Sequence, residues 1–313
     1  MHKKTLPASS FMALFVLILC LLQLFTAHLH SNIPAASGNA YASPAQASSS
    51  QPLPLKPVDT GGIDPPPVIS ESAILICPNT NEILYEKNSH ERLYPASITK
   101  VMAAVLAIER CSPDETTIAS KKAVFGIEFG SSNAGFNAGE ELTVDQLLHA
   151  LLLYSANEAA NILGEHICGS VEDFVALMNS RAAELGAADT NFVTPNGLHD
   201  DNHYTTAYDM ALIARYAMTL PYFRKIVSAS YYSMPPTNKY PKGDKVFYNS
   251  NKLIRNGTPY PKGIGYPYAT GIKTGYTIKA GHTLIASAKK GDTELIAVLL
   301  KGRMEGTTIS CYI

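Results

Sequence analysis

The sequence predicts an α+β fold in which a five-stranded antiparallel sheet is flanked by helices, with a mostly helical insertion. Three observations predict it. Two short β-prone runs lie early in the chain, three more lie near its end, and the long stretch between them has helical patterning. The economical fold closes the early and late strands into one sheet, with the helices covering one face and adding a lobe beside it.

The strands come in two groups. The early runs, 73–77 and 83–86, are separated by the turn-forming sequence PNTN, so we expect a hairpin. The late runs are GIKTGYT, GHTLIASA and TELIAVLL, and the last two are joined by KKGD. Such spacing indicates sequential antiparallel strands.

The helices between the two groups have recognisable ends. An almost wholly apolar stretch follows Pro95, and Thr143 with Gln146 forms a capping box ahead of LLHALLLY. EAANILGEHI and VEDFVALMNSRAAELG carry helical apolar spacing, and the second should end at Gly186. YDMALIARYAM is a further predicted helix that stops before Pro221.

Composition limits the function classes. The chain has 313 residues, is 46% hydrophobic and 16% charged, and carries a net charge of −1. It is long enough for one large domain or two small ones with a proper core. The balanced charge gives no electrostatic case for nucleic acid or for acidic lipid as a partner.

The N-terminal segment is predicted to direct export. Residues 1–30 place basic residues ahead of an apolar run at 11–25, the order of a signal peptide or signal anchor, with a cleavage option near residue 42. An uncleaved segment would attach the protein to a membrane. Residues 31–67 are rich in Ala, Ser and Pro and are predicted to form a disordered tether, and 68–313 form the folded domain.

The cysteines beyond that segment predict neither a zinc site nor a disulfide framework. Cys77, Cys111, Cys168 and Cys311 are scattered, with no CxxC motif and no paired histidine spacing. Buried or idle thiols are the simpler interpretation.

One lysine lies where a cation is poorly tolerated. Lys100 falls in the first turn of the apolar helix after Pro95, where burial and the positive end of the helix dipole both disfavour a charged amine. Ser97 precedes it by three residues, so the two side chains share one helix face. A neutral lysine there could take the proton of a serine nucleophile. The same spacing recurs at Ser287 and Lys290, so this motif alone is weak evidence.

Two further motifs strengthen the hypothesis. Ser155 and Asn157 lie at a predicted junction between two apolar helices, where their side chains can point into a cleft. Lys273 and Thr274 should alternate across a strand, and Gly275 allows another chain to lie close against its backbone.

Together the motifs SITK, SAN and KTG resemble those of the serine penicillin-recognising enzymes in order and in structural setting. From about residue 70 to 302 the chain is similar to the D-alanyl-D-alanine carboxypeptidases, the low-molecular-mass penicillin-binding proteins. The resemblance rests on stretches such as SANEAANILGEHI, TNFVTPNGLHDDNHYTTAYDMALIARYAM and GIKTGYTIKAGHTLIASAKKGDTELIAVLLKG. It implies a β-lactamase/transpeptidase-like fold.

The resemblance also implies a reaction. Ser97 would attack the carbonyl between the two terminal D-alanines of a peptidoglycan stem peptide and form an acyl-enzyme that water hydrolyses. Lys100 would take the Ser97 proton, Ser155 would relay a proton to the departing nitrogen, and Asn157 would orient Lys100 and the substrate amide.

The KTG strand would bind the substrate. Lys273 would supply positive charge, Thr274 would bind the terminal carboxylate, Gly275 would allow close approach, and the backbone amides of Ser97 and Tyr276 would form the oxyanion hole. No metal or cofactor is implied. A β-lactam antibiotic would trap Ser97, and the enzyme would work at the outer face of the cytoplasmic membrane or in the cell wall.

Two other functions stay open. A β-lactamase shares all three motifs, but the ExxLN pattern of class A members is missing between Ala160 and Gly197. A non-catalytic binder of cell-wall peptides is the other. Relatives continue past the last strand into a helix that packs on the sheet, whereas this sequence reads MEGTTISCYI, so one sheet face is expected to be partly bare.

A histidine-based triad is a weaker interpretation. His149 is predicted on a helix, and His199 and His203 lie in a polar loop. Because Lys100 already fills the role of base, none of the three histidines is expected to be catalytic.

Overall fold

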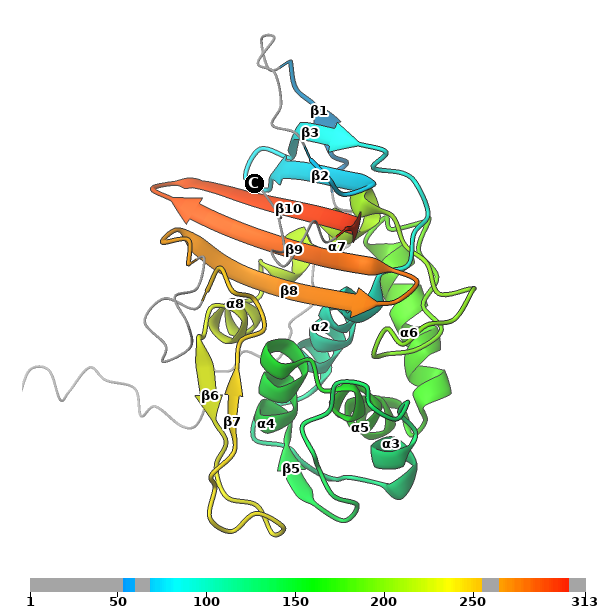
Figure 1. Cartoon of the computed structure of the whole chain (residues 1–313), viewed down its shortest axis with the longest axis vertical. Coiled ribbons are helices and arrows are strands. Elements are labelled where there is room, and N and C mark those ends of the chain that lie inside the picture. The colour runs from blue at the N-terminus through cyan, green and yellow to red at the C-terminus, as the bar shows by residue number, and fades with distance from the viewer. Residues whose placement is uncertain (1–52, 60–67, 255–264, 304–313) are drawn as a thin grey trace, which may run out of the picture. The chain divides into compact units, whose positions relative to one another are not determined.

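The computed structural model describes residues 53–59, 68–254 and 265–303. In this part of the chain a mixed sheet lies against a layer of helices, and further helices extend beyond it (Figure 1). The α+β class is therefore confirmed.

The main sheet has six strands in the order β1-β3-β2-β10-β9-β8. They are β1 (Lys56–Pro57), β2 (Ser72–Cys77), β3 (Glu82–Lys87), β8 (Ala269–Thr277), β9 (Gly281–Lys290) and β10 (Thr293–Gly302). The early hairpin forms β2 and β3, and the late runs form β8 to β10. Strand β10 pairs antiparallel with β2, with Ile296 opposite Ile76, and this pairing joins the two groups as predicted.

The predicted count of five strands is wrong, because β1 adds a sixth that runs parallel to β3. The amide of Lys56 donates to the Asn81 carbonyl oxygen at 3.0 Å, and that of Val58 donates to Ile83 O at 3.2 Å. Pro57, which has no amide hydrogen, falls between these two donors and is tolerated on an edge strand. Leu55 is buried in the core. Composition had placed this segment in the predicted tether.

The predicted helices appear in the predicted order, together with helices at 121–125 and 221–227 that were not predicted. They are η1 (Ala96–Thr99), α2 (Lys100–Arg110), α3 (Lys121–Phe125), α4 (Val144–His149), η2 (Ala150–Tyr154), α5 (Asn157–Cys168), α6 (Val171–Glu184), α7 (Ala207–Ala217) and α8 (Pro221–Val227). The capping box of Thr143 and Gln146 is present, and Gly186 has a φ of +84° just beyond α6. Pro221 begins α8 instead of only ending α7, since proline fits a first helical turn.

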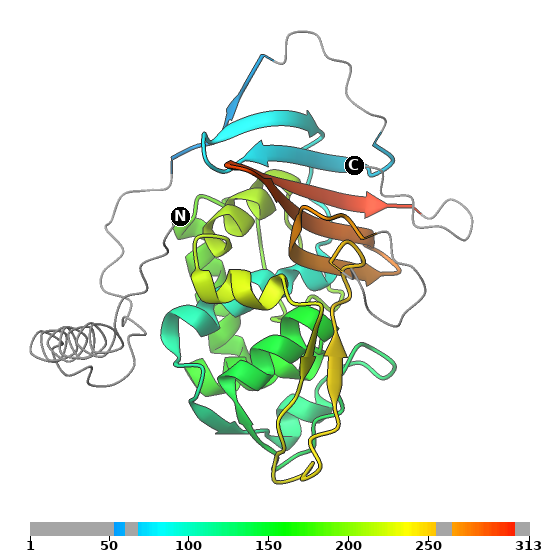
Figure 2. The same cartoon turned by 90° about the vertical axis from the view of Figure 1, so that its left-hand side faces the viewer.

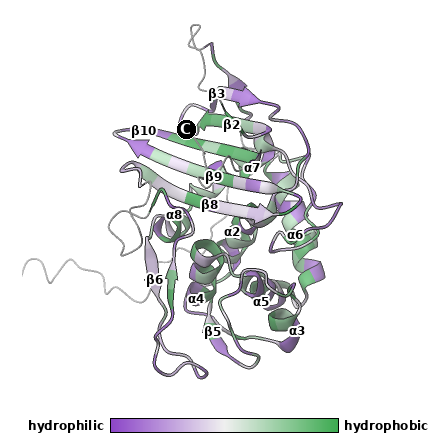
Figure 3. Cartoon of the chain, in the orientation of Figure 1, coloured by the Kyte–Doolittle hydropathy of each residue, from purple (hydrophilic) through white to green (hydrophobic). Residues whose placement is uncertain are grey.

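Helix α2 lies at the centre of the hydrophobic core. Residues 100–107 are all buried, and α2 contacts α5, α6, α7 and α8. Helix α7 lies against β2 and β10, and α8 lies against β8, so helices cover one face of the sheet (Figures 1 and 2). Strands β2 and β10 are hydrophobic over most of their length (Figure 3), as central strands should be.

The opposite face of the sheet is covered at its centre. A smaller hydrophobic cluster forms there from side chains no more than 9% exposed, namely Ala73, Leu284, Ala286 and Leu299. Val68, Tyr85 and Leu253 pack against it. The expectation of a partly bare face concerned the chain after β10, where residues 304–313 lie outside the described residues, so it stays a prediction.

Two small ribbons were not predicted. Strand β4 (Thr116–Ile118) pairs with β5 (Glu141–Thr143), and β6 (Tyr231–Ser233) pairs with β7 (Val246–Tyr248). Three residues are too few to show an alternating pattern.

Several predictions fall on other parts of the chain. The export segment 1–30, the cleavage option near residue 42, the remainder of the tether and residues 304–313 with Cys311 lie outside the described residues. Within the described ranges, no helix has the length and apolar character needed to cross a membrane.

Candidate active site

Ser97 lies in η1, the short turn that leads into α2. It lines a pocket of about 410 Å³ whose walls also include Ser155, Thr274 and Tyr276. The Thr283 hydroxyl of β9 donates to the Pro95 carbonyl oxygen at 2.9 Å and ties this turn to the sheet. The pocket thus gathers residues from three segments that are far apart in the sequence.

The Lys100 amine is fully buried and has three oxygen neighbours. Its Nζ lies 2.8 Å from Ser97 Oγ, 2.7 Å from Asn157 Oδ1 and 2.6 Å from the Asn196 carbonyl oxygen. Asn157 Oδ1 and the Asn196 carbonyl oxygen can only accept hydrogen bonds, so each takes one N–H group of the Lys100 amine. In a neutral amine, the lone pair then faces the Ser97 hydroxyl. This is the geometry that a general base requires.

Burial also favours the neutral amine. It lowers the pKa of Lys100 well below its usual value, and the positive charge of Lys273 lowers it further, while Glu158 acts in the opposite direction. The sequence-based argument for a proton-accepting lysine is consistent with this shift.

Ser155 and Asn157 lie at the junction between η2 and α5, where the sequence placed them. Ser155 has a φ of +69°, a left-handed conformation that interrupts the helix. It lines the pocket, and Asn157 starts α5 with its side chain on Lys100.

The KTG motif lies on β8 beside Ser97. Lys273 is fully buried, and burial lowers its pKa to about 7. Its Nζ donates to Thr274 O at 2.8 Å, while Thr274 Oγ1 lies 2.8 Å from Ser250 Oγ at the pocket wall. A Cβ on Gly275 would lie only 2.8 Å from the Ser97 backbone nitrogen. Only glycine allows β8 to approach η1 so closely.

Sequence reasoning missed one wall of the site. The carbonyl of Asn196 accepts from Lys100, and Gly197, with a φ of +81°, packs against the Ala96 carbonyl so closely that a Cβ would lie 2.0 Å from its oxygen. The only local signal was the turn-forming pair Asn-Gly in a polar loop.

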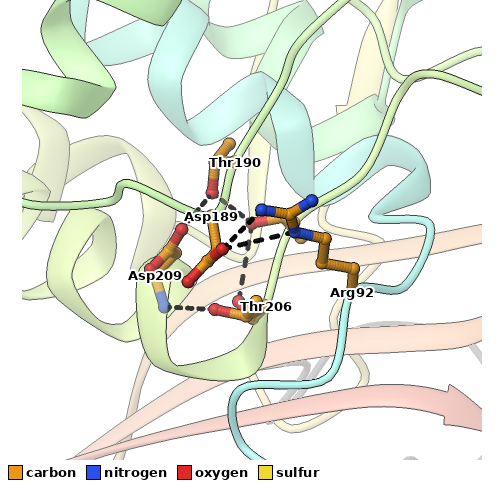
Figure 4. Close-up of polar contacts among 6 residues, drawn as sticks. Arg92, Asp189, Thr190, Thr206 and Asp209 are labelled. Atoms are coloured by element: carbon orange, nitrogen blue, oxygen red, sulfur yellow. Dashed lines mark hydrogen bonds and ion pairs between the residues drawn. The ribbon is translucent and has the colours of Figure 1, made fainter.

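Polar contacts hold that loop in place (Figure 4). Arg92 pairs with Asp189 at 2.7 Å, and Thr190 donates to the buried Asp209 carboxylate at 2.7 Å. Thr206 caps α7 by accepting from the Asp209 amide. These bonds attach the two ends of the loop 189–206, which contains Asn196, to α7 and to the chain before η1.

The amino-acid sequence matches one known protein family over most of the described residues. A family model described as D-alanyl-D-alanine carboxypeptidase matches residues 60–304, well over half of the chain. The chain belongs to this family of serine carboxypeptidases.

Individual relatives of the family are similar over most of the chain. DacF of Bacillus subtilis, a D-alanyl-D-alanine carboxypeptidase, is 38% identical over 234 residues, which cover 74% of this chain and 57% of DacF. DacA of Escherichia coli, also a D-alanyl-D-alanine carboxypeptidase, is 34% identical over 246 residues, which cover 76% of this chain and 57% of DacA. The chain therefore spans little more than half of the length of these two relatives.

Solved structures of the family have the same fold. A D-alanyl-D-alanine carboxypeptidase from Mycobacterium tuberculosis matches with a TM-score of 0.70 at 30% identity, over 79% of this chain and 88% of that one. Penicillin binding protein 5 from Haemophilus influenzae matches with a TM-score of 0.68 at 30% identity, over 78% of this chain and 68% of that one.

The histidines have structural contacts. His203 is buried and accepts from the Val193 amide through Nδ1, so its Nε2 donates to Thr99 Oγ1 at 2.8 Å. Burial lowers the pKa of His203 to about 4. His149 stacks on Tyr232, and His199 pairs with Asp201.

The second serine-lysine motif has a different setting. Ser287 lies within β9 and its Oγ is 2.8 Å from Thr270 Oγ1, while Lys290 ends the strand with an exposed side chain. The structure therefore gathers the predicted site residues of the three motifs around one pocket and leaves this copy in the sheet.

Proposed function

We propose that the protein is a serine-type D-Ala-D-Ala carboxypeptidase that removes the terminal D-alanine from peptidoglycan stem pentapeptides. The observation that carries this proposal is the 2.8 Å contact between Ser97 Oγ and the buried Lys100 amine. The other two oxygen neighbours of this amine take its N–H groups and leave its lone pair facing the serine. The names of DacF and DacA support the same activity.

Acylation would use the residues around Lys100. As Ser97 Oγ attacks the carbonyl carbon of the penultimate D-alanine, Lys100 takes the hydroxyl proton. The carbonyl oxygen of the substrate becomes an oxyanion, which the backbone amides of Ser97 and Tyr276 would hold. The C–N bond then breaks, and Ser155 relays a proton to the departing D-alanine nitrogen. Asn157 keeps Lys100 oriented throughout.

The terminal carboxylate of the substrate explains the KTG strand. The Thr274 hydroxyl faces the pocket beside Ser250 and would donate to that carboxylate, while charged Lys273 favours an anion nearby. Gly275 keeps the oxyanion site open. A substrate that lacks the free carboxylate would leave these groups unpaired.

Hydrolysis of the ester would complete the cycle. Water attacks the acyl-enzyme, and Ser97 leaves with a proton. A β-lactam would acylate Ser97 in the same way, but its leaving nitrogen stays attached through the opened ring. The adduct would therefore persist.

Because basic residues precede an apolar run at the N-terminus, we place this activity outside the cytoplasm.

Labelling with a fluorescent penicillin tests the proposal. We expect a stable covalent adduct on the peptide that contains Ser97, located by mass spectrometry, and release of D-alanine from a peptide ending in D-Ala-D-Ala. Fast turnover of penicillin without D-alanine release would indicate a β-lactamase. A folded chain that takes no label would indicate a peptide binder or an inert chain.

Gly275→Ala is expected to slow acylation by roughly 10²- to 10³-fold, because the new methyl group would displace an oxyanion donor. Its Cβ would lie 2.4 Å from Thr283 Oγ1 as well as 2.8 Å from Ser97 N. The rate of penicillin labelling measures the effect. Gly302→Ala, in the same sheet with its nearest neighbours at 3.3 Å, is the matched control and should label at a nearly normal rate. Equal rates for both variants would contradict the proposed geometry.

The pH dependence of acylation should follow Lys273. The reaction needs neutral Lys100 and charged Lys273, so the rate constant of acylation by penicillin should fall as pH rises above about 7, the pKa of Lys273. In Lys273→Met this descending limb should disappear, and acylation at pH 6 should be slower by roughly 10²-fold. A descending limb that survives unchanged in Lys273→Met would assign it to another group.

The same shift predicts how stability varies with pH. Between about 7 and 10.5 the unfolded chain keeps a proton on Lys273 that the folded chain loses, so the free energy of unfolding should rise with pH in this window. One such group contributes at most about 1.4 kcal/mol per pH unit. Denaturant unfolding of Lys273→Met should show a smaller slope.

A further inference from the structure

A second group of chemically reactive side chains lies at the opposite ends of the two helices that carry the active-site residues. Cys111 follows the last residue of α2, Glu115 lies four residues further along in the loop after this helix, and His166 lies in the last turn of α5. Their ligand atoms, Cys111 Sγ, a Glu115 carboxylate oxygen and a His166 ring nitrogen, all lie within 4.8 Å of one another. The proposed carboxypeptidase reaction uses none of them.

We propose that Cys111, Glu115 and His166 bind a zinc ion, with water at the fourth position. Thiolate, imidazole and carboxylate are the three side-chain ligand types of protein zinc sites, whereas Mg²⁺ and Ca²⁺ prefer oxygen alone. A sulfur ligand beside a nitrogen ligand also suits zinc better than manganese.

The cluster is already partly arranged for a metal. Glu115 Oε1 accepts from the Ser112 amide at 2.6 Å, which turns Oε2 towards His166 Nε2 at 3.2 Å. Bonds of about 2.0–2.3 Å around a tetrahedral zinc ion hold ligand atoms roughly 3–4 Å apart, so only a small contraction is needed. The Ser112 contact acts as the orienting bond that metal ligands usually have.

Solvent can reach the site. The Glu115 side chain is 44% exposed and that of His166 is 21% exposed, and Cys111 is half-buried. An ion can therefore enter without unfolding the chain, and a water ligand has room. Cys168 ends α5 two residues after His166.

The location indicates what the ion would do. Lys100 is the first residue of α2 and Asn157 is the first residue of α5, and their side chains meet at 2.7 Å. Counted along the helix axes, Cys111 lies about 16 Å from Lys100, and His166 lies about 14 Å from Asn157. A bound ion would clamp those ends together and so fix the angle between the helices that present Lys100 and Asn157. Because the ligands come from segments about fifty residues apart, sequence spacing could not reveal them.

Metal titration of the whole chain tests this proposal. Reduced protein stripped with a chelator would be titrated with Co²⁺ and then Zn²⁺. We expect one equivalent of Co²⁺ to give a thiolate charge-transfer band in the near ultraviolet, and Zn²⁺ to displace it. Cys111→Ser should lose the band, and His166→Ala should bind Zn²⁺ at least tenfold more weakly in competition with a chromophoric chelator. Cys77→Ser, a half-buried thiol on β2, is the matched control and should behave as the unaltered chain.

A second measurement separates metal binding from loss of fold. Zn²⁺ should raise the melting temperature of the unaltered chain and of Cys77→Ser but not that of Cys111→Ser, although all three label with penicillin. The proposal is overturned if Co²⁺ binds without a thiolate band, if Cys111→Ser binds zinc as tightly as the unaltered chain, or if Cys111 and Cys168 oxidise to a disulfide in saturating zinc.

Discussion

Ser97→Ala is expected to abolish covalent labelling by penicillin and to lower D-alanine release by at least roughly 10⁴-fold. The hydroxyl oxygen is the atom that would carry the acyl group, and no other serine lies within hydrogen-bonding distance of the Lys100 amine among the described residues. Labelling on a gel and release of D-alanine from a D-Ala-D-Ala peptide are the two measurements.

The matched control for this variant is Ser287→Ala. Ser287 also precedes a lysine by three residues, but its hydroxyl contacts Thr270 within the sheet. Losing this hydrogen bond should cost about 1 kcal/mol of stability and leave labelling intact. If Ser97→Ala still released D-alanine, the nucleophile would be another group and the proposed function would have to be abandoned.

Lys100→Met is expected to slow acylation by roughly 10³- to 10⁴-fold, the range of a positioned general base. Methionine has a similar length and fills the buried space, but it has no lone pair of sufficient basicity for the Ser97 proton. The decisive quantity is the acylation rate constant measured with saturating penicillin, because binding of the β-lactam in the pocket should change much less.

Lys100→Arg distinguishes a base from a hydrogen-bond donor. Arginine can still donate to Asn157 Oδ1 and to Asn196 O, but its guanidinium group stays protonated near neutral pH and cannot accept a proton. We therefore expect Lys100→Arg to be as slow as Lys100→Met. Recovery of acylation by arginine in a folded variant would mean that Lys100 only positions its neighbours.

Local patterns predicted most of the elements. The capping box of Thr143 and Gln146, the glycine after α6 and the PNTN turn between β2 and β3 all appear in the structure. Each depends on residues a few positions apart, so its physics is complete within a short window of sequence. Strand β1 escaped prediction because two residues with a proline carry no such pattern, and only pairing with β3 orders them.

The active site also combines features that are visible in the sequence with features that only the fold creates. The apolar helix, the serine one turn before Lys100 and the glycine in KTG are visible in the sequence, and with the family resemblance they indicate acyl transfer by a serine. The third oxygen on Lys100, from Asn196, is not visible, because it comes from a loop 96 residues further along the chain. The same holds for the contact of Gly197 with Ala96.

Sequence alone therefore indicated the fold class and the family, and it predicted which residues would serve as nucleophile and base. Folding added the environment that the proposed base requires: complete burial of Lys100, a second buried lysine nearby, and two amide oxygens that leave its lone pair facing Ser97. It also brought Cys111 and His166 together at the far ends of α2 and α5. Propensity and capping act between neighbours, whereas desolvation and ligand geometry depend on which distant segments pack together.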